Sequence, residues 1–148
     1  IDPQMIDFLA TNMIEQTGLK VATLIRRIED AADLSNPNVV KVVINRNNEA
    51  MYFSRQAIPF VRDFPVDSWL EHGVYYKHVG MYAYTSQALM AIEKLHMHPY
   101  EALEKLEQLT WIAHGLSIEC YETNMESIGI DTEEDLKAVT SMIAELED

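Results

Sequence analysis

Apolar side chains recur along this chain with two different spacings, which predict where helices and strands lie. Near the start of the chain the spacing is that of a helix, with one apolar stripe. The stripe consists of Met5, Ile6, Leu9 and Met13. Asp2 is a suitable N-cap and Pro3 suits the first helical position, while Gly18 can end the helix. The sequence therefore predicts a helix over residues 2–18.

Beyond Gly18, short runs rich in β-branched and aromatic residues alternate with helical patterns. Strands are expected at residues 19–28, 75–84 and 116–123, a helical turn at 29–37, and helices at 85–96, 98–115 and 132–147. Residues 38–54 contain two β-rich runs joined by a polar, Asn-rich turn, which predicts a β-hairpin. This order predicts an α/β fold in one domain, residues 1–148, with flanking helices and a mixed, mostly parallel sheet.

Composition narrows the classes of function. The 148 residues, 48% of them hydrophobic, suit one globular domain, and the formal charge of −13 argues against nucleic-acid binding and against an anionic membrane surface. A single cysteine, Cys120, excludes an internal disulfide framework and suits a reducing compartment. The longest uncharged run, residues 78–92, is too short and too polar to span a bilayer, and no export signal is visible. We expect a soluble, cytoplasmic protein.

The strand at residues 75–84 carries the first candidate site. Period-two alternation places five residues on one face: Tyr76, His78, Gly80, Tyr82 and Tyr84. A histidine, a glycine and a tyrosine hydroxyl in one row suit a pocket for a hydroxyl-rich ligand. Packing residues with satisfied polar tips are the alternative, and spacing alone does not choose.

The helix expected at 98–115 carries the second candidate. Its apolar stripe is expected to consist of Ala102, Leu106, Leu109 and Ala113, with Leu103 beside it. Glu107 and Gln108 then flank the stripe, where a carboxylate next to an amide can hold sugar hydroxyls. A solvated helix face explains the same pattern.

Asp131 precedes Thr132, the expected N-cap of the last helix, so its carboxylate is not used for capping. Magnesium prefers one or two carboxylates together with phosphate oxygens and water, so Asp131 is a candidate half-site. The alternative is an ordinary turn aspartate.

Two arginines stand in the apolar segment that follows the hairpin. Arg55 comes directly after the second β-rich run, and Arg62 lies beyond Pro59, which interrupts any regular element. Arginine suits bidentate binding of a carboxylate or a phosphate. Surface pairing with neighbours such as Asp63 remains the alternative for both.

Four segments occur in a specific order and spacing: NPNVVKVVINRNNEAMYFSRQAIPFVRD, YKHVGMYAY, LEKLEQLTWIAHG and SIGIDTEEDLKAV. Together they resemble the C-terminal part of the 3-deoxy-manno-octulosonate cytidylyltransferase (CMP-Kdo synthetase) family, over essentially the whole chain. The resemblance implies a nucleotide-diphospho-sugar transferase-like, Rossmann-like fold that lacks the N-terminal nucleotide-binding half. The family's basic glycine-containing loop for the CTP triphosphate and its first magnesium-binding aspartate do not occur here.

The family couples CTP to the eight-carbon sugar acid Kdo with magnesium, releasing pyrophosphate and making CMP-Kdo for lipopolysaccharide. The resemblance assigns Asp131 as the second magnesium-binding carboxylate; His78, Tyr82, Glu107 and Gln108 to the surroundings of the sugar; and Arg62, with Arg55 as a second candidate, to the sugar carboxylate or the phosphates. The sugar's anomeric hydroxyl attacks, so no covalent protein nucleophile is required. A homodimer is likewise implied by the resemblance.

Three hypotheses follow for the function. The first is a fragment of a CMP-Kdo synthetase that is inactive alone. The second is a cytidylyltransferase for a related ulosonic acid, such as an amino-Kdo or a nonulosonate. The third is a non-catalytic half-domain that pairs with a separate N-terminal chain.

Overall fold

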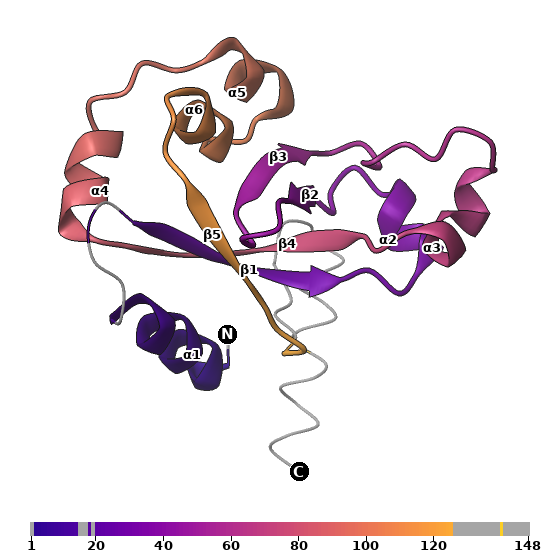
Figure 1. Ribbon diagram of the computed structural model, residues 1–148, viewed down its shortest axis with the longest axis horizontal. Helices are drawn as coiled ribbons and strands as arrows, with labels where there is room; N and C mark the ends of the chain where they lie inside the picture. Colours follow the sequence, from indigo (N-terminus) through magenta and orange to yellow (C-terminus); the bar gives the residue numbers. More distant parts are fainter. Residues whose placement is uncertain (1, 15–17, 19, 126–139, 141–148) are drawn as a thin grey trace.

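The computed structural model describes residues 2–14, 18, 20–125 and 140, and their strands form a single five-stranded sheet (Figure 1). The strands are β1 (Val21–Arg27), β2 (Lys41–Ile44), β3 (Ala50–Ser54), β4 (Tyr76–Tyr84) and β5 (Ile118–Glu122), in the order β3-β2-β4-β1-β5. The helices are α1 (Pro3–Ile14), α2 (Ala31–Ser35), η1 (Val66–Ser68), α3 (Trp69–His72), α4 (Ser86–Ile92), α5 (Pro99–Glu104) and α6 (Gln108–Ala113). The predicted α/β fold with a hairpin is confirmed.

The strand pairing corrects one part of the prediction. The pairs β2–β3, β2–β4 and β1–β4 are antiparallel, and among the described strands only β1 and β5 pair in parallel. The sheet is therefore mixed, as expected, but the expectation that it is mostly parallel is wrong. A short turn between neighbouring strands, such as residues 45–49, permits only antiparallel pairing, whereas parallel neighbours need a long crossover.

The two faces of the sheet are covered by different helices, as Figure 1 shows. Helix α1 lies on one face, where Met5, Leu9 and Met13 pack with Ala22 and Leu24 of β1. The opposite face, which carries the candidate site, packs against residues of α4 and α6. Because successive residues of β1 point to opposite faces, one strand serves both cores.

Helix α1 confirms most of the predicted stripe. Asp2 caps the helix, because the Gln4 amide donates a hydrogen bond of 2.9 Å to the Asp2 side chain. Ile6, which was expected in the buried stripe, is 55% exposed. The helix buries residues spaced by four, so its contact with the sheet is narrower than the sequence pattern allowed.

The single helix expected at 98–115 is two helices, α5 and α6. The break lies at Lys105, whose backbone is left-handed with φ 55°. The break changes which side chains are buried: Leu106 and Leu109 enter the core, but Leu103 is 79% exposed. Local helix propensity is high here, so tertiary packing overrides it. Gly115, predicted to end the segment, has φ 84° just beyond α6.

The remaining predicted elements agree with the structure to within a few residues at their ends, and α4 is shorter than the segment 85–96 expected for it. The short helices η1 and α3 lie in a segment for which the sequence predicted no element. The helix expected at 132–147 falls largely outside the described residues. Within the part of the chain that the structure describes, no helix is long and apolar enough to cross a membrane.

Candidate functional site

The site is built around an irregularity in β4. Thr23 of β1 pairs with Tyr82, but the next residue, Leu24, pairs with Val79, so two residues of β4 bulge out of the register. Residues four apart on a regular strand are separated by about 13 Å. The rings of His78 and Tyr82 have centroids only 5.1 Å apart. The bulge therefore converts two side chains that merely share a face into direct neighbours.

His78 is enclosed on several sides. Its Nε2 lies 2.9 Å from the hydroxyl of Thr23, and its ring meets the ring of Phe53 edge-on at 5.2 Å. Burial lowers the pKa of His78 from 6.5 to about 4. The imidazole is therefore neutral near pH 7, where it can exchange hydrogen bonds with a ligand hydroxyl but supplies no positive charge.

Tyr82 presents a polar atom without a partner. Its hydroxyl is fully buried and makes no hydrogen bond within the described part of the chain. The ring packs edge-on against Trp111 of α6 at 5.2 Å and stacks on Tyr84 at 5.9 Å. Burial raises the pKa of Tyr82 far above its usual value, so the hydroxyl keeps its proton. Buried hydroxyls are nearly always paired, so this hydroxyl is available to a hydrogen-bond partner from outside the described residues.

Glu107 and Gln108 stand at the start of α6, which also supplies Trp111. Burial is the largest cause of the raised pKa values of Tyr82 and Tyr84, and the negative charge of Glu107 adds to both shifts. Glu107 is exposed, as a solvated helix flank would be. Gln108 is only 5% exposed, so the solvated-face interpretation does not describe it. The structure thus brings His78 and Tyr82 together, and Glu107 and Gln108 stand at the start of the helix whose Trp111 packs on Tyr82.

The Arg55 side chain donates hydrogen bonds to main-chain carbonyl oxygens. Its Nε donates to the carbonyl of Glu104 at 2.8 Å, and its Nη1 donates to the carbonyl of Pro37 at 3.0 Å. The Glu104 carboxylate in turn accepts from the Arg55 amide at 2.9 Å and from the Ser54 hydroxyl at 2.7 Å. These contacts join the end of β3 to the end of α5. In this geometry Arg55 stabilises the fold, and two of its donors are not available to a substrate.

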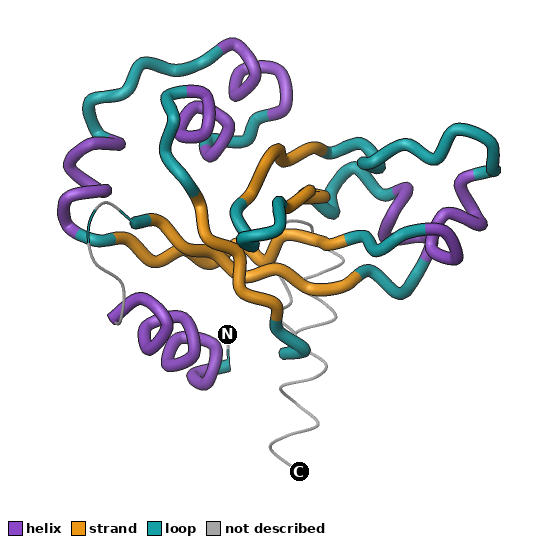
Figure 2. Tube along the Cα trace, viewed as in Figure 1, coloured by secondary structure: helices purple, strands orange, loops and turns teal. Residues whose placement is uncertain are grey.

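Arg62 lies in the loop between β3 and η1. Loops, including this one, are drawn in teal in Figure 2. The Arg62 side chain is exposed, and within the described residues it forms no ion pair, including none with Asp63. The surface pair with Asp63, which was the alternative interpretation, is therefore not formed, and the Arg62 guanidinium has no ion-pair partner among the described residues. Asp131 lies outside the described residues.

Two residues of the site were missed by the sequence reasoning. Thr23 is the one polar residue in the apolar run VATLI, and this is the signal that marks it. Trp111 was assigned to a helix without a role, since its contact with Tyr82 depends on the break before α6. Neither contact is local in sequence.

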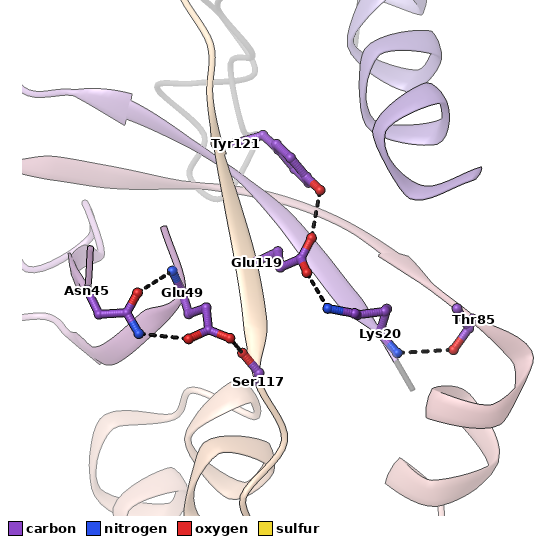
Figure 3. A network of polar contacts seen from close by, with 7 residues as sticks. All are labelled: Lys20, Asn45, Glu49, Thr85, Ser117, Glu119 and Tyr121. Carbon is purple, nitrogen blue, oxygen red and sulfur yellow. Dashed lines mark hydrogen bonds and ion pairs between the residues drawn. The ribbon is translucent and has the colours of Figure 1, made fainter. Parts of the chain in front are cut away.

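A second polar cluster ties the hairpin turn to β5 and to the start of β1 (Figure 3). Glu49 accepts hydrogen bonds from Ser117 at 2.6 Å and from Asn45 at 2.7 Å, and these bonds lower the pKa of its carboxyl. Glu119 accepts from Lys20 at 2.5 Å and from Tyr121 at 2.7 Å. Every polar group shown is paired, which is typical of a structural cluster.

The chemistry of the remaining reactive groups is limited. Burial raises the pKa of the Cys120 thiol to about 12, so it is not a nucleophile at neutral pH. The described residues contain no group of three or more His, Cys, Asp or Glu side chains placed to hold a metal ion. They therefore do not fit a complete magnesium site.

The family model for cytidylyltransferases matches residues 1–127, so the chain belongs to the cytidylyltransferase family. It is 45% identical over 141 residues to a 3-deoxy-manno-octulosonate cytidylyltransferase from Cytophaga hutchinsonii, covering 95% of this chain and 56% of that protein. It is 40% identical over 148 residues to the protein of the same name from Parabacteroides distasonis, covering 97% of this chain and 59% of that protein.

Among solved structures, CMP:2-keto-3-deoxy-manno-octonic acid synthetase complexed with CTP is similar with a TM-score of 0.86 and 36% identity. The similarity covers 98% of this chain and 57% of that one. The resemblance seen in the sequence motifs is confirmed. The chain spans a little over half the length of these relatives.

Proposed function

We propose that this chain is the sugar-binding part of a CMP-Kdo synthetase, which activates Kdo with CTP. The observation that carries the proposal is the similarity, at a TM-score of 0.86, to a synthetase of this name in complex with CTP. The curated relatives of the same name support it at 38–45% identity. The contact between His78 and Tyr82 supports it independently, because the buried Tyr82 hydroxyl has no hydrogen-bond partner in the described residues.

In the proposed reaction, the anomeric hydroxyl of Kdo attacks the α-phosphorus of CTP, and the bond to pyrophosphate breaks. Neutral His78 and the Tyr82 hydroxyl bind sugar hydroxyls, and the Glu107 carboxylate accepts a hydrogen bond from another. Arg62 pairs with the sugar carboxylate, because its guanidinium has no partner in the described residues. These residues orient the nucleophile, and no covalent intermediate is needed.

Magnesium is part of the proposal, with Asp131 as one ligand. When bound, the ion supplies charge neutralisation at the phosphates. The described residues do not complete its coordination, so further ligands must come from outside them or from the nucleotide.

We also propose that the assembled enzyme is a cytoplasmic homodimer that acts in lipopolysaccharide synthesis. Support for association comes from β3, which is an edge strand, and from apolar side chains exposed on β3 and α5. Met51 is 59% exposed, Tyr100 50% and Leu103 79%. Sedimentation equilibrium of the chain, compared with the Leu103→Lys variant, tests this part of the proposal.

The function is tested by measuring pyrophosphate release with CTP, Kdo and magnesium. The 148-residue chain alone should be inactive, and activity should appear on addition of the N-terminal half of a relative and disappear in Asp131→Ala. Binding of Kdo to the chain, followed by calorimetry, tests the sugar site separately. Competition with an amino-Kdo or a nonulosonate distinguishes a related sugar acid as the true substrate, and failure to bind any of these acids would refute the proposal.

A further inference from the structure

Thr23 carries a buried hydroxyl at the base of the candidate site. The residue is 0% exposed, in the middle of β1, and it points to the same face as His78. Its Oγ1 lies 2.9 Å from His78 Nε2, 2.8 Å from the carbonyl oxygen of Met81, and 3.4 Å from that of Val79. One hydroxyl therefore contacts both the site histidine and the bulge in β4.

The single proton of the Thr23 hydroxyl determines which ring nitrogen of His78 carries a proton. A carbonyl oxygen only accepts, so the short contact with Met81 uses the Thr23 proton. The hydroxyl oxygen then has lone pairs but no proton left for His78, and the contact of 2.9 Å requires Nε2 to be the donor. The imidazole is neutral, so with its proton on Nε2 its Nδ1 carries a lone pair.

The lone pair on Nδ1 of His78 can accept a hydrogen bond from a ligand. Within the described residues, Nδ1 of His78 has no hydrogen-bond partner, whereas the protonated nitrogen is occupied by Thr23. The ring is held on its other sides by Phe53 and Tyr82. The ring that carries this acceptor lies 5.1 Å from the ring of Tyr82, whose hydroxyl is unpaired in the described residues.

The same hydroxyl holds the backbone shape that brings these rings together. Gly80 and Met81 have no partner residue on β1, because the register passes from Tyr82 directly to Val79. Thr23 donates to the Met81 carbonyl inside this bulge. Valine at this position would keep the β-branched shape and the β propensity but would remove the hydroxyl and its contacts with Met81 and His78.

We propose that Thr23 is a positioning residue, which fixes the proton of His78 on Nε2 and presents Nδ1 as the acceptor for a hydroxyl of the sugar acid. Thr23 does not contact the sugar and acts only through His78 and the bulge. The identity of the ligand depends on the proposed function. The assignment of the His78 proton to Nε2 does not depend on it.

The state of the histidine is measured by ¹⁵N NMR of the imidazole nitrogens in the 148-residue chain near pH 7. In the wild type, His78 should show a protonated Nε2 and an unprotonated Nδ1, with widely separated shifts. In Thr23→Val the two shifts should move toward each other as the tautomers exchange, and Thr23→Ser should restore the wild-type pattern. A proton on Nδ1 in the wild type, or the same shifts in wild type and Thr23→Val, would overturn the inference. The wild-type measurement decides even where Thr23→Val does not fold.

The ligand-facing part is tested by titrating the same three proteins with Kdo. Loss of one oriented acceptor predicts binding about three- to tenfold weaker in Thr23→Val. Thr23→Ser should bind like the wild type. Equal affinity in wild type and Thr23→Val would overturn the positioning role. Absence of binding to the wild type, with the predicted NMR pattern present, would refute the proposed function and the ligand-facing role while confirming the bond to Thr23.

Discussion

Replacing Tyr82 by phenylalanine removes one oxygen atom from the site, and its effects on stability and on binding should have opposite signs. The oxygen is buried and has no hydrogen-bond partner in the described residues. The ring makes the packing contacts with Trp111 and Tyr84, and phenylalanine retains these. Tyr82→Phe should therefore remove an unfavourable group from the free protein and a binding group from the complex.

The magnitude follows from the cost of an unpaired buried hydroxyl, which is about 1–3 kcal/mol. Since packing is conserved, we expect the free energy of unfolding to rise by about 1 kcal/mol, which corresponds to about 2–4 °C in Tm for a chain of this size. Tyr75→Phe is the matched control, because the buried Tyr75 hydroxyl donates to the carbonyl of Pro59 at 2.7 Å. That substitution leaves a carbonyl unpaired and should lower the free energy of unfolding by about 1 kcal/mol.

Urea and thermal unfolding of wild type, Tyr82→Phe and Tyr75→Phe measure the two changes, and calorimetry with Kdo measures binding. Tyr82→Phe should be the more stable protein and the weaker binder. A Tyr82→Phe variant destabilised as much as Tyr75→Phe would show that the hydroxyl has a partner in the free protein, and the reasoning would fail. Unchanged Kdo affinity in Tyr82→Phe would remove this residue from the sugar site.

Three further predictions concern stability. The folded pKa of His78, about 4, lies below its ordinary 6.5, so the unfolded chain binds the extra proton between these values. The contribution of neutral His78 to the free energy of unfolding, about 3 kcal/mol, is therefore complete above pH 6.5 and is lost as the pH falls toward 4. Measured by urea unfolding across this range, the free energy of unfolding should depend less on pH in His78→Asn than in the wild type. Equal pH dependence in the two proteins would contradict the assignment. Arg55→Lys should lower the free energy of unfolding by about 1–2 kcal/mol because it breaks the contacts with two carbonyls, while exposed Arg62→Lys should change it by less than about 0.5 kcal/mol. Lys105→Gly should leave Tm unchanged or higher because its φ of 55° suits glycine, whereas Leu103→Gly inside α5 should lower stability by about 1 kcal/mol; similar losses in both would argue against the break.

Much of the secondary structure could be predicted because its signals are local. The cap at Asp2, the polar turn of the hairpin and the apolar spacing of α1 each depend on a few neighbouring residues. The family motifs could be recognised for a similar reason, since each is a continuous segment. One of these segments, YKHVGMYAY, contains both His78 and Tyr82.

Other features depended on contacts between distant segments. Residues 98–115 have the pattern of one helix, and nothing local marks Lys105 as left-handed, so the break follows from how Leu106, Leu109 and Trp111 pack on the sheet. The sequences of the individual strands likewise do not determine whether neighbouring strands pair in parallel or antiparallel. Burial of Ile6 was predicted from its spacing, but only the actual width of the contact with β1 decided that it is exposed.

The candidate site shows the same division. The sequence by itself determined the residue types and placed His78 and Tyr82 on one face, because side chains alternate along a strand. Only the tertiary structure decided that a bulge opposite Thr23 brings their rings within 5.1 Å, and that the tyrosine hydroxyl has no partner in the described part of the chain. The physical reason is that register, burial and hydrogen-bond partners are set by a neighbouring strand more than fifty residues away in sequence, which no local pattern encodes.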